Sequence, residues 1–198
     1  MPPVAGAPAF QSSISEITPE IATQFTHSWR AGCPVELSEL RLVTLSHWNF
    51  AGEATTGELA VRRDFAEAMV QVFERLYDAR FPIQQMQLVD VFSGNDNLSM
   101  TANNTSAFNC REVAFRPGVW SNHALGTAID VNPLVNPYVS DTLVLPPEGS
   151  PFADRSVEAL GGIYPGGVVV QAFADVGWGW GGDWVSAKDW QHFSASGR

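Results

Sequence analysis

The segment that organises this chain is Ser121-Asn122-His123-Ala124-Leu125-Gly126-Thr127-Ala128-Ile129-Asp130. Residues 127–132 alternate in character and are rich in β-branched side chains, which predicts a short strand with Asp130 pointing to one face. Gly126 lets the backbone turn just before this strand, so His123 can fold back toward the same point. One imidazole and one carboxylate are therefore expected to converge.

A second imidazole and a second carboxylate lie near the end of the chain, in Asp189-Trp190-Gln191-His192. Residues three apart are neighbours only on a helical or turn-like segment, so we infer a turn that brings Asp189 beside His192. Catalytic zinc takes three protein ligands and leaves a fourth position to water, whose pKa falls to about 7. The residues predict a metal site built from His123, Asp130 and His192, with Asp189 next to it.

The pattern Ser-x-His-x-x-Gly-x-Ala-x-Asp, followed by Asp-x-x-His, resembles that of the LAS zinc peptidases, the group of lysostaphin, the D-alanyl-D-alanine peptidases and hedgehog. It is most similar to the branch of D-alanyl-D-alanine carboxypeptidases and L-alanyl-D-glutamate endopeptidases. The resemblance covers roughly residues 26–194. Beyond the metal pattern, it is carried by Leu59–Val72, Phe81–Ile83, Asn104–Arg111, Asn132–Pro133, Asn136–Tyr138 and Trp180–Trp184.

The resemblance implies Zn²⁺ as the cofactor, held by the two imidazoles and the first carboxylate. It implies that Asp189 is the general base, although several relatives carry Glu there and the shorter Asp has a different reach. Arg111 matches an arginine that binds substrate and polarises the scissile carbonyl, and Ser121 matches a supporting serine beside the first ligand. Ser121 has an equal alternative interpretation as an ordinary turn hydroxyl. Arg116 is a second candidate contact for substrate.

The function implied by the resemblance is zinc-dependent hydrolysis of peptide bonds in the stem peptides of bacterial peptidoglycan, of carboxypeptidase or endopeptidase type. Residues 93–119 and 139–166 would decide between the two types. The alternatives are a zinc-containing binding module without turnover and the catalytic domain of a phage-type endolysin. Retention of Asp189 and Arg111 favours an enzyme. A secreted or cell-wall-associated bacterial protein, with its signal peptide already removed, is expected.

Composition bounds the remaining choices. The 198 residues are 45% hydrophobic and show no internal repeat, so we expect one domain, residues 15–198, after a flexible leader at 1–14 that is rich in Pro and Ala. The net charge of −10 argues against nucleic acid as a partner. No apolar stretch is long enough to span a bilayer. The protein is expected to be a monomer.

The fold class expected is α+β, because strands and helices interleave without regular βαβ alternation. The resemblance narrows this to a Hedgehog/DD-peptidase-like fold, a small antiparallel sheet flanked by helices. The expected helices lie near 19–29, 62–79 and 167–176, and the expected strands lie near 40–49, 85–92, 127–132 and from His192 onward.

Two cysteines, Cys33 and Cys110, form an even count in a chain that the resemblance places outside the cytoplasm. A disulfide between them, which would brace the loop carrying Arg111, is favoured over free thiols. His27 and His47 are interpreted as structural, and Asp183 as a turn residue after two glycines. Aromatic side chains near the expected site suit either core packing or a substrate groove; they are Trp120, Trp178, Trp180, Trp184 and Trp190.

Overall fold

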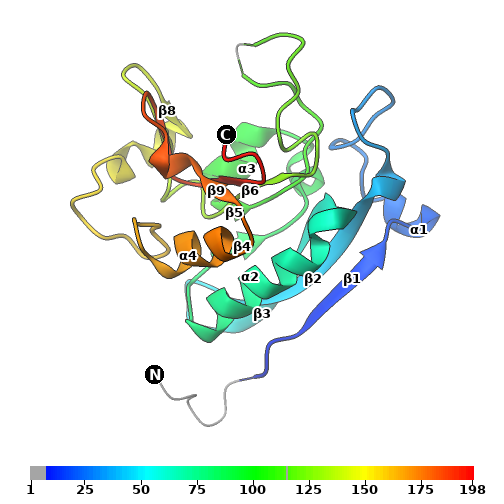
Figure 1. Cartoon of the computed structure of the whole chain (residues 1–198), viewed down its shortest axis with the longest axis horizontal. Helices are drawn as coiled ribbons and strands as arrows, with labels where there is room; N and C mark the ends of the chain where they lie inside the picture. Colours follow the sequence, from blue (N-terminus) through cyan, green and yellow to red (C-terminus); the bar gives the residue numbers. More distant parts are fainter. Residues whose placement is uncertain (1–7, 115) are drawn as a thin grey trace.

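A three-stranded antiparallel sheet crossed by one helix forms the N-terminal half of the fold (Figure 1). The computed structural model describes residues 8–114 and 116–198. The sheet has the order β1 (Ser12–Glu16), β2 (Leu40–Trp48), β3 (Ala54–Arg62), and α2 (Ala66–Asp78) packs across one face. Helix α2 buries one apolar stripe that includes Met69, Phe73 and Leu76, which is the face that the 3.6-residue periodicity predicts.

Short strands from distant parts of the chain build the region that holds the candidate site. Strands β6 (Ala128–Asp130), β11 (His192–Ser194) and β9 (Gly179–Trp180) form one small antiparallel sheet. Another consists of β10 (Lys188–Asp189), β7 (Tyr138–Val139) and β8 (Val144–Leu145), while β4 (Gln85–Met86) and β5 (Asn104–Thr105) pair in parallel. The described residues are thus mixed α and β with small antiparallel sheets, in agreement with an α+β class.

The remaining helical elements are short. The α-helices are α1 (Pro19–Ala22), α3 (Asp96–Thr101) and α4 (Val168–Asp175), and the 3-10 turns are Leu37–Glu39, Arg63–Phe65, Val89–Phe92, Pro147–Phe152 and Gly181–Asp183. No helix within the described ranges has the length and apolar character needed to cross a membrane.

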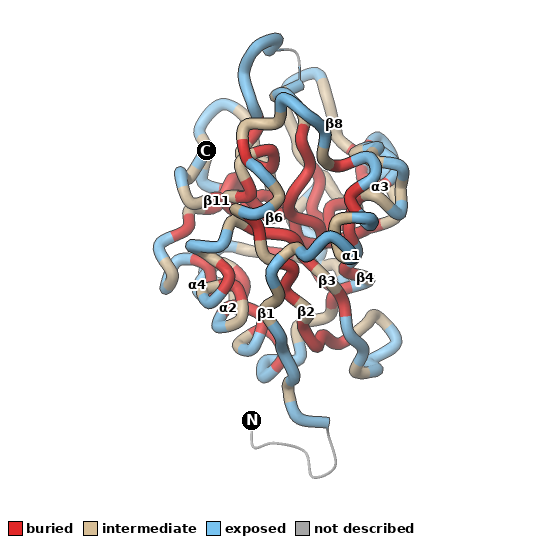
Figure 2. The backbone as a smooth tube through the Cα atoms, turned by 90° about the vertical axis from the view of Figure 1, so that its right-hand side faces the viewer, coloured by how far each residue is buried: buried red, intermediate tan, exposed pale blue. Residues whose placement is uncertain are grey.

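Buried segments run through the interior of the molecule (Figure 2). Their apolar side chains form two clusters that hold these parts together. The larger one lies between the sheet, α2 and α4, and reaches the small sheet through Phe193. The ring of Phe193 stacks on Phe173 of α4 with centroids 4.1 Å apart. Since Phe193 follows His192 directly, this packing anchors the strand that carries a predicted metal ligand. The smaller cluster surrounds Cys110 and Phe25 on the other face of the sheet.

Two expectations about secondary structure were wrong. The helix near 19–29 ends at Ala22, and the backbone N–H groups of His27 and Ser28 bind the carboxylate of Asp90 at 2.7 and 3.0 Å instead of helical carbonyls. The strand near 85–92 ends at Met86 and is followed by the turn at Val89–Phe92.

The leader expected at 1–14 overlaps an ordered strand. Residues 12–14 pair with residues 45–43 of β2, so the ordered sheet begins at Ser12. Residues 1–7 lie outside the described residues. The strand predicted at 40–49 and the helix predicted at 62–79 are present as β2 and as α2 with its preceding turn.

Candidate metal centre

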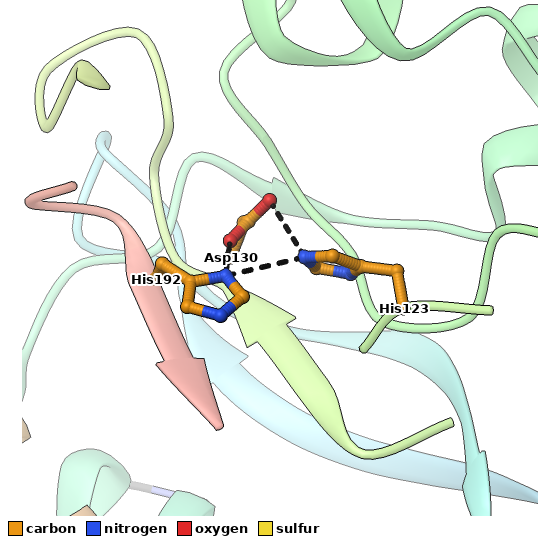
Figure 3. A group of neighbouring side chains, drawn as sticks. All are labelled: His123, Asp130 and His192. Atoms are coloured by element: carbon orange, nitrogen blue, oxygen red, sulfur yellow. Dashed lines mark hydrogen bonds and ion pairs between the residues drawn. The ribbon is translucent and has the colours of Figure 1, made fainter. Parts of the chain in front are cut away.

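Asp130 and His192 are brought together by strand pairing (Figure 3). The antiparallel register of β6 and β11 sets these two residues opposite each other, with Asp130 Oδ1 3.0 Å from His192 Nδ1. The second carboxylate oxygen, Oδ2, lies 3.1 Å from His123 Nε2, and the two imidazole nitrogens are 3.3 Å apart. All three side chains are buried. Two nitrogens and one carboxylate thus meet at one point, as the sequence predicted.

The spacing of these atoms fits a tetrahedral zinc ion. Zinc bonds to nitrogen and carboxylate oxygen of about 2.0–2.2 Å correspond to ligand atoms roughly 3.3–3.6 Å from one another. The separations of 3.0, 3.1 and 3.3 Å in this cluster are close to that value. These distances involve both carboxylate oxygens, Oδ1 toward His192 and Oδ2 toward His123, and one ligand atom from each of the three residues lies within 4.8 Å of the others. The donor set therefore fits a zinc ion, which takes three protein ligands in catalytic sites.

His123 is held in the orientation that a ligand needs. Its Nδ1–H donates to the Ala107 carbonyl at 2.6 Å, which leaves the lone pair of Nε2 directed at the cluster. The Ser121 hydroxyl accepts the His123 backbone N–H at 3.2 Å and so shapes the turn. Gly126 has φ +67°, and a Cβ there would lie 2.8 Å from the Arg62 backbone nitrogen. Glycine is therefore needed at this turn both for its backbone conformation and because a side chain would collide with Arg62.

Charge balance explains how a buried carboxylate is tolerated here. Burial alone would raise the pKa of Asp130, but the charge and hydrogen bonds of His123 and His192 lower it far below the ordinary value. Burial would conversely lower the pKa of His123, whereas the Asp130 carboxylate raises it. Protons and a divalent cation therefore compete for the same imidazole nitrogens, so metal affinity should depend on pH.

Asp189 lies three residues before His192 and has an unsatisfied carboxylate oxygen. It ends β10, and residues 190–191 form the predicted bend that leads into β11. Although the residue is partly exposed, its Oδ1 is buried and has no hydrogen-bond partner among the described residues. Burial raises the pKa of Asp189 to about 7, with a further contribution from the negative charge of Asp130. Such an oxygen is available to accept a proton near neutral pH.

Gly181 allows Asp189 to take this position. A Cβ at residue 181 would lie 2.6 Å from the Asp189 carbonyl oxygen and 2.8 Å from the Asp189 Cβ. Any side chain there would push β10 away from the turn at Gly181–Asp183. The sequence Trp-Gly-Gly-Asp-Trp shows a glycine at this position, but the reason for it, the close approach of Asp189, is visible only in the structure.

Arg111 lies directly before Glu112, which pairs with Trp120 in an isolated antiparallel bridge. Its carbonyl accepts the Ser121 N–H at 3.1 Å, and its Nη2 lies 2.8 Å from Asp96 Oδ2 in α3. The neighbouring Asn109 N–H donates to the His123 carbonyl at 3.3 Å, so the backbone segment that carries Arg111 is paired with the segment that carries His123. Arg116 is exposed farther along the loop and has no ion pair among the described residues.

The other histidines lie apart from the cluster. His47 is buried in β2, and burial lowers its pKa to about 4, so its imidazole is neutral. His27 is exposed after α1 and outside the helix expected for it. Asp183 is exposed in the turn that follows β9, in keeping with its interpretation as a turn residue.

The tryptophans divide between core and site. Trp178 and Trp180 are buried in the larger cluster, and partly buried Trp190 packs against it with its ring 5.5 Å from that of Trp180. The Trp184 ring lies 5.6 Å from the His192 ring, so it is next to one of the predicted ligands. Trp120 is partly exposed on the loop next to Ser121.

Cys33 and Cys110 form a disulfide, with their Cα atoms 5.9 Å apart.

Two contributors to the site gave no recognisable signal in the sequence. Ala107 acts through its backbone carbonyl, which any residue possesses, and Asp96 is one of 21 acidic residues whose partner is 15 positions away.

A family model described as D-alanyl-D-alanine carboxypeptidase matches residues 115–195. The match contains the three clustered residues and Asp189, while Arg111 lies before it. Comparisons with curated proteins and with solved structures gave no match. The C-terminal part of the chain is therefore similar to that family of LAS-type zinc peptidases, and the Hedgehog/DD-peptidase-like fold stays a prediction.

Proposed function

We propose that this protein is a zinc-dependent peptidase that cleaves the stem peptides of bacterial peptidoglycan. The observation that carries the proposal is the buried cluster of His123, Asp130 and His192, together with the unpartnered carboxylate oxygen of Asp189 three residues before His192. The family match over residues 115–195 supports the same chemistry, since it spans all four residues. Carboxypeptidase action on D-alanyl-D-alanine and endopeptidase action on L-alanyl-D-glutamate both remain within the proposal.

The residues divide the reaction between them. When bound, zinc would polarise the scissile carbonyl and lower the pKa of a water molecule. Asp189 Oδ1 would accept the proton of the attacking water and return it to the leaving amine. His123, Asp130 and His192 would hold the ion, and the carbonyl of Ala107 would fix the His123 ring.

Arg111 supplies the complementary positive charge. Its planar guanidinium can donate two parallel hydrogen bonds to a substrate carboxylate or one to the developing oxyanion. The neighbouring Ser121 contributes through the His123 backbone, because its hydroxyl is engaged there. This proposed role for Ser121 is positioning.

An extracellular location completes the proposal. Peptidoglycan lies outside the cytoplasm, where the Cys33–Cys110 disulfide would persist. The net charge of −10 makes general attraction to an anionic wall unfavourable. Substrate recognition by a single subunit would then rest on local groups such as Arg111.

The decisive experiment is digestion of defined muropeptides followed by mass spectrometry, with zinc measured on the same sample. We expect release of D-alanine or cleavage after L-alanine, loss of activity with a chelator, and recovery with Zn²⁺. Asp189→Asn should retain zinc and lose turnover, whereas Asp183→Asn, a matched change at an exposed aspartate nearby, should be fully active. A protein that binds zinc but leaves every muropeptide intact would instead be the binding module considered above, and the proposal would fail.

A further inference from the structure

The backbone around Arg111 is fixed by several independent contacts. Cys110, the preceding residue, is bonded to Cys33. The Cys110 N–H donates to the Ser28 carbonyl at 2.8 Å, and Arg30 Nη1 donates to the Cys110 carbonyl at 2.6 Å. These contacts set where the Arg111 side chain begins, but its four torsions remain free to place the guanidinium elsewhere.

One short contact fixes the far end of that side chain. Arg111 Nη2 lies 2.8 Å from Asp96 Oδ2, and the two side chains are 31% and 27% exposed. The other contacts are weaker, because Nη1 lies 3.5 Å from the Glu112 carbonyl and Nε is buried without a partner among the described residues. The direction of the guanidinium therefore depends on Asp96.

Asp96 is itself attached to the frame that holds Arg111. It opens α3, where the Asn95 side chain caps the helix by accepting the Leu98 N–H at 3.1 Å. The preceding turn supplies Asp90, whose Oδ1 accepts the N–H groups of His27 and Ser28. The Ser28 carbonyl also accepts the Cys110 N–H, so Ser28 connects the segment before Arg111 with the turn that precedes α3.

We propose that Asp96 is a positioning residue that holds the Arg111 guanidinium toward the metal centre, and that it acts through Arg111 and not on substrate. The inference rests on the proposed function for its effect on turnover. Backbone hydrogen bonds place Arg111 next to the segment that carries the first predicted ligand: the Arg111 carbonyl accepts the Ser121 N–H at 3.1 Å, and the Asn109 N–H donates to the His123 carbonyl at 3.3 Å. Because the Asp96–Arg111 pair is partly exposed to solvent, we expect it to act mainly by orienting a substrate-binding group and to add little to stability.

A double-mutant cycle tests this role. Asp96→Asn should lower kcat/KM about tenfold, and Asp96→Glu, which keeps the charge, should recover part of the loss. In an Arg111→Ala background, Asp96→Asn should change kcat/KM less than about twofold, because the group it positions is gone. Equal losses in both backgrounds, or no loss in the otherwise unchanged protein, would overturn the proposal.

The control separates this effect from the general loss of an ion pair. Asp175→Asn breaks a pair with Arg75 between α4 and α2 and should leave kcat/KM unchanged. Zinc content should stay unchanged in all these variants. Asp96 also carries a negative charge in the first turn of α3, and Asp96→Glu keeps its favourable interaction with the helix dipole.

A second measurement does not depend on substrate. The Nε–Hε resonance of Arg111 should exchange slowly with water and show restricted motion in the protein as it stands, and Asp96→Asn should speed exchange and increase motion. An unchanged resonance would overturn the positioning role even if the variant lost activity. Absence of muropeptide hydrolysis in the unmodified protein would count against the proposed function, while this measurement would still decide the role of Asp96.

Discussion

Asp130 and His192 lie opposite each other in the antiparallel register of β6 and β11, with Oδ1 and Nδ1 3.0 Å apart. They are 62 positions apart in the chain, so strand pairing alone delivers two of the three candidate ligands to one point. A slip of one residue would turn one of them to the opposite face of the sheet. Phe193, next to His192, is fully buried, and the same slip would turn its ring out of the core, so burial of this ring opposes the slip.

Removal of zinc should destabilise the folded protein. An ion that binds only the native state adds RT ln(1 + [L]/Kd), about 2.7 kcal/mol at a hundredfold excess over Kd. We expect the thermal unfolding midpoint to fall on chelation and to recover with Zn²⁺. His123→Ala should abolish both the zinc content and the shift in midpoint, while His27→Ala, at an exposed histidine, should change neither. Zinc retained at full stoichiometry in His123→Ala would contradict the ligand assignment.

Asp189 should govern the acid limb of the activity profile. Burial raises the pKa of its carboxyl to about 7. Protonation removes the base, so kcat/KM should fall as pH falls through the pKa. Bound zinc adds positive charge nearby, which should move this limb below pH 7. Asp189→Asn should lose at least about 100-fold in kcat and should lack the limb in any residual activity.

The same carboxyl should also affect stability, with a defined sign. Its folded pKa of about 7 is above the ordinary value of 3.8, so the folded state of the metal-free protein binds the proton more tightly. The unfolding free energy contributed by this group should therefore decrease as pH rises from about 4 to about 7. Asp189→Asn should remove that decrease and stabilise the metal-free protein at pH 8. Identical pH dependences in urea titrations of the two proteins would refute this.

The sequence could predict those features whose cause lies within a short segment of the chain. The cluster of His123, Asp130 and His192 was within reach because strand alternation and the glycine turn are properties of short segments. Helix α2 was predictable from its apolar periodicity. Strand β1 was missed because its side chains are largely exposed and its place in the sheet comes from backbone pairing with β2.

The failures near α1 and Arg111 have a non-local origin. The helix expected to reach residue 29 ends early, and distant Asp90 binds the backbone N–H groups of His27 and Ser28. The ion pair of Arg111 with Asp96 also joins two segments that have no common local pattern. Neither relationship leaves a periodic signal that a single sequence could reveal.

Gly181→Ala should impair catalysis more than metal binding. The added methyl would lie 2.6 Å from the Asp189 carbonyl oxygen, so β10 must move and carry the carboxylate with it. A displacement of about 1 Å at a catalytic group can lower the rate by roughly a hundredfold. Steady-state kinetics and zinc analysis of the variant should show reduced kcat with metal retained. A variant with normal kcat would show that β10 does not need the close approach.

Reduction of the Cys33–Cys110 disulfide should weaken both stability and substrate binding. The bond closes a loop with a sequence separation of 77 residues, and loss of such a cross-link costs about 2–5 kcal/mol of unfolding free energy. Because Cys110 precedes Arg111, the reduced protein should also show a raised KM at temperatures where it stays folded. Zinc content should be unaffected, since the ligands lie on other segments. Kinetics and urea unfolding of Cys33→Ser, which leaves Cys110 in place beside Arg111, would measure both effects, and a KM equal to that of the oxidised protein would exclude the disulfide from any role in holding Arg111.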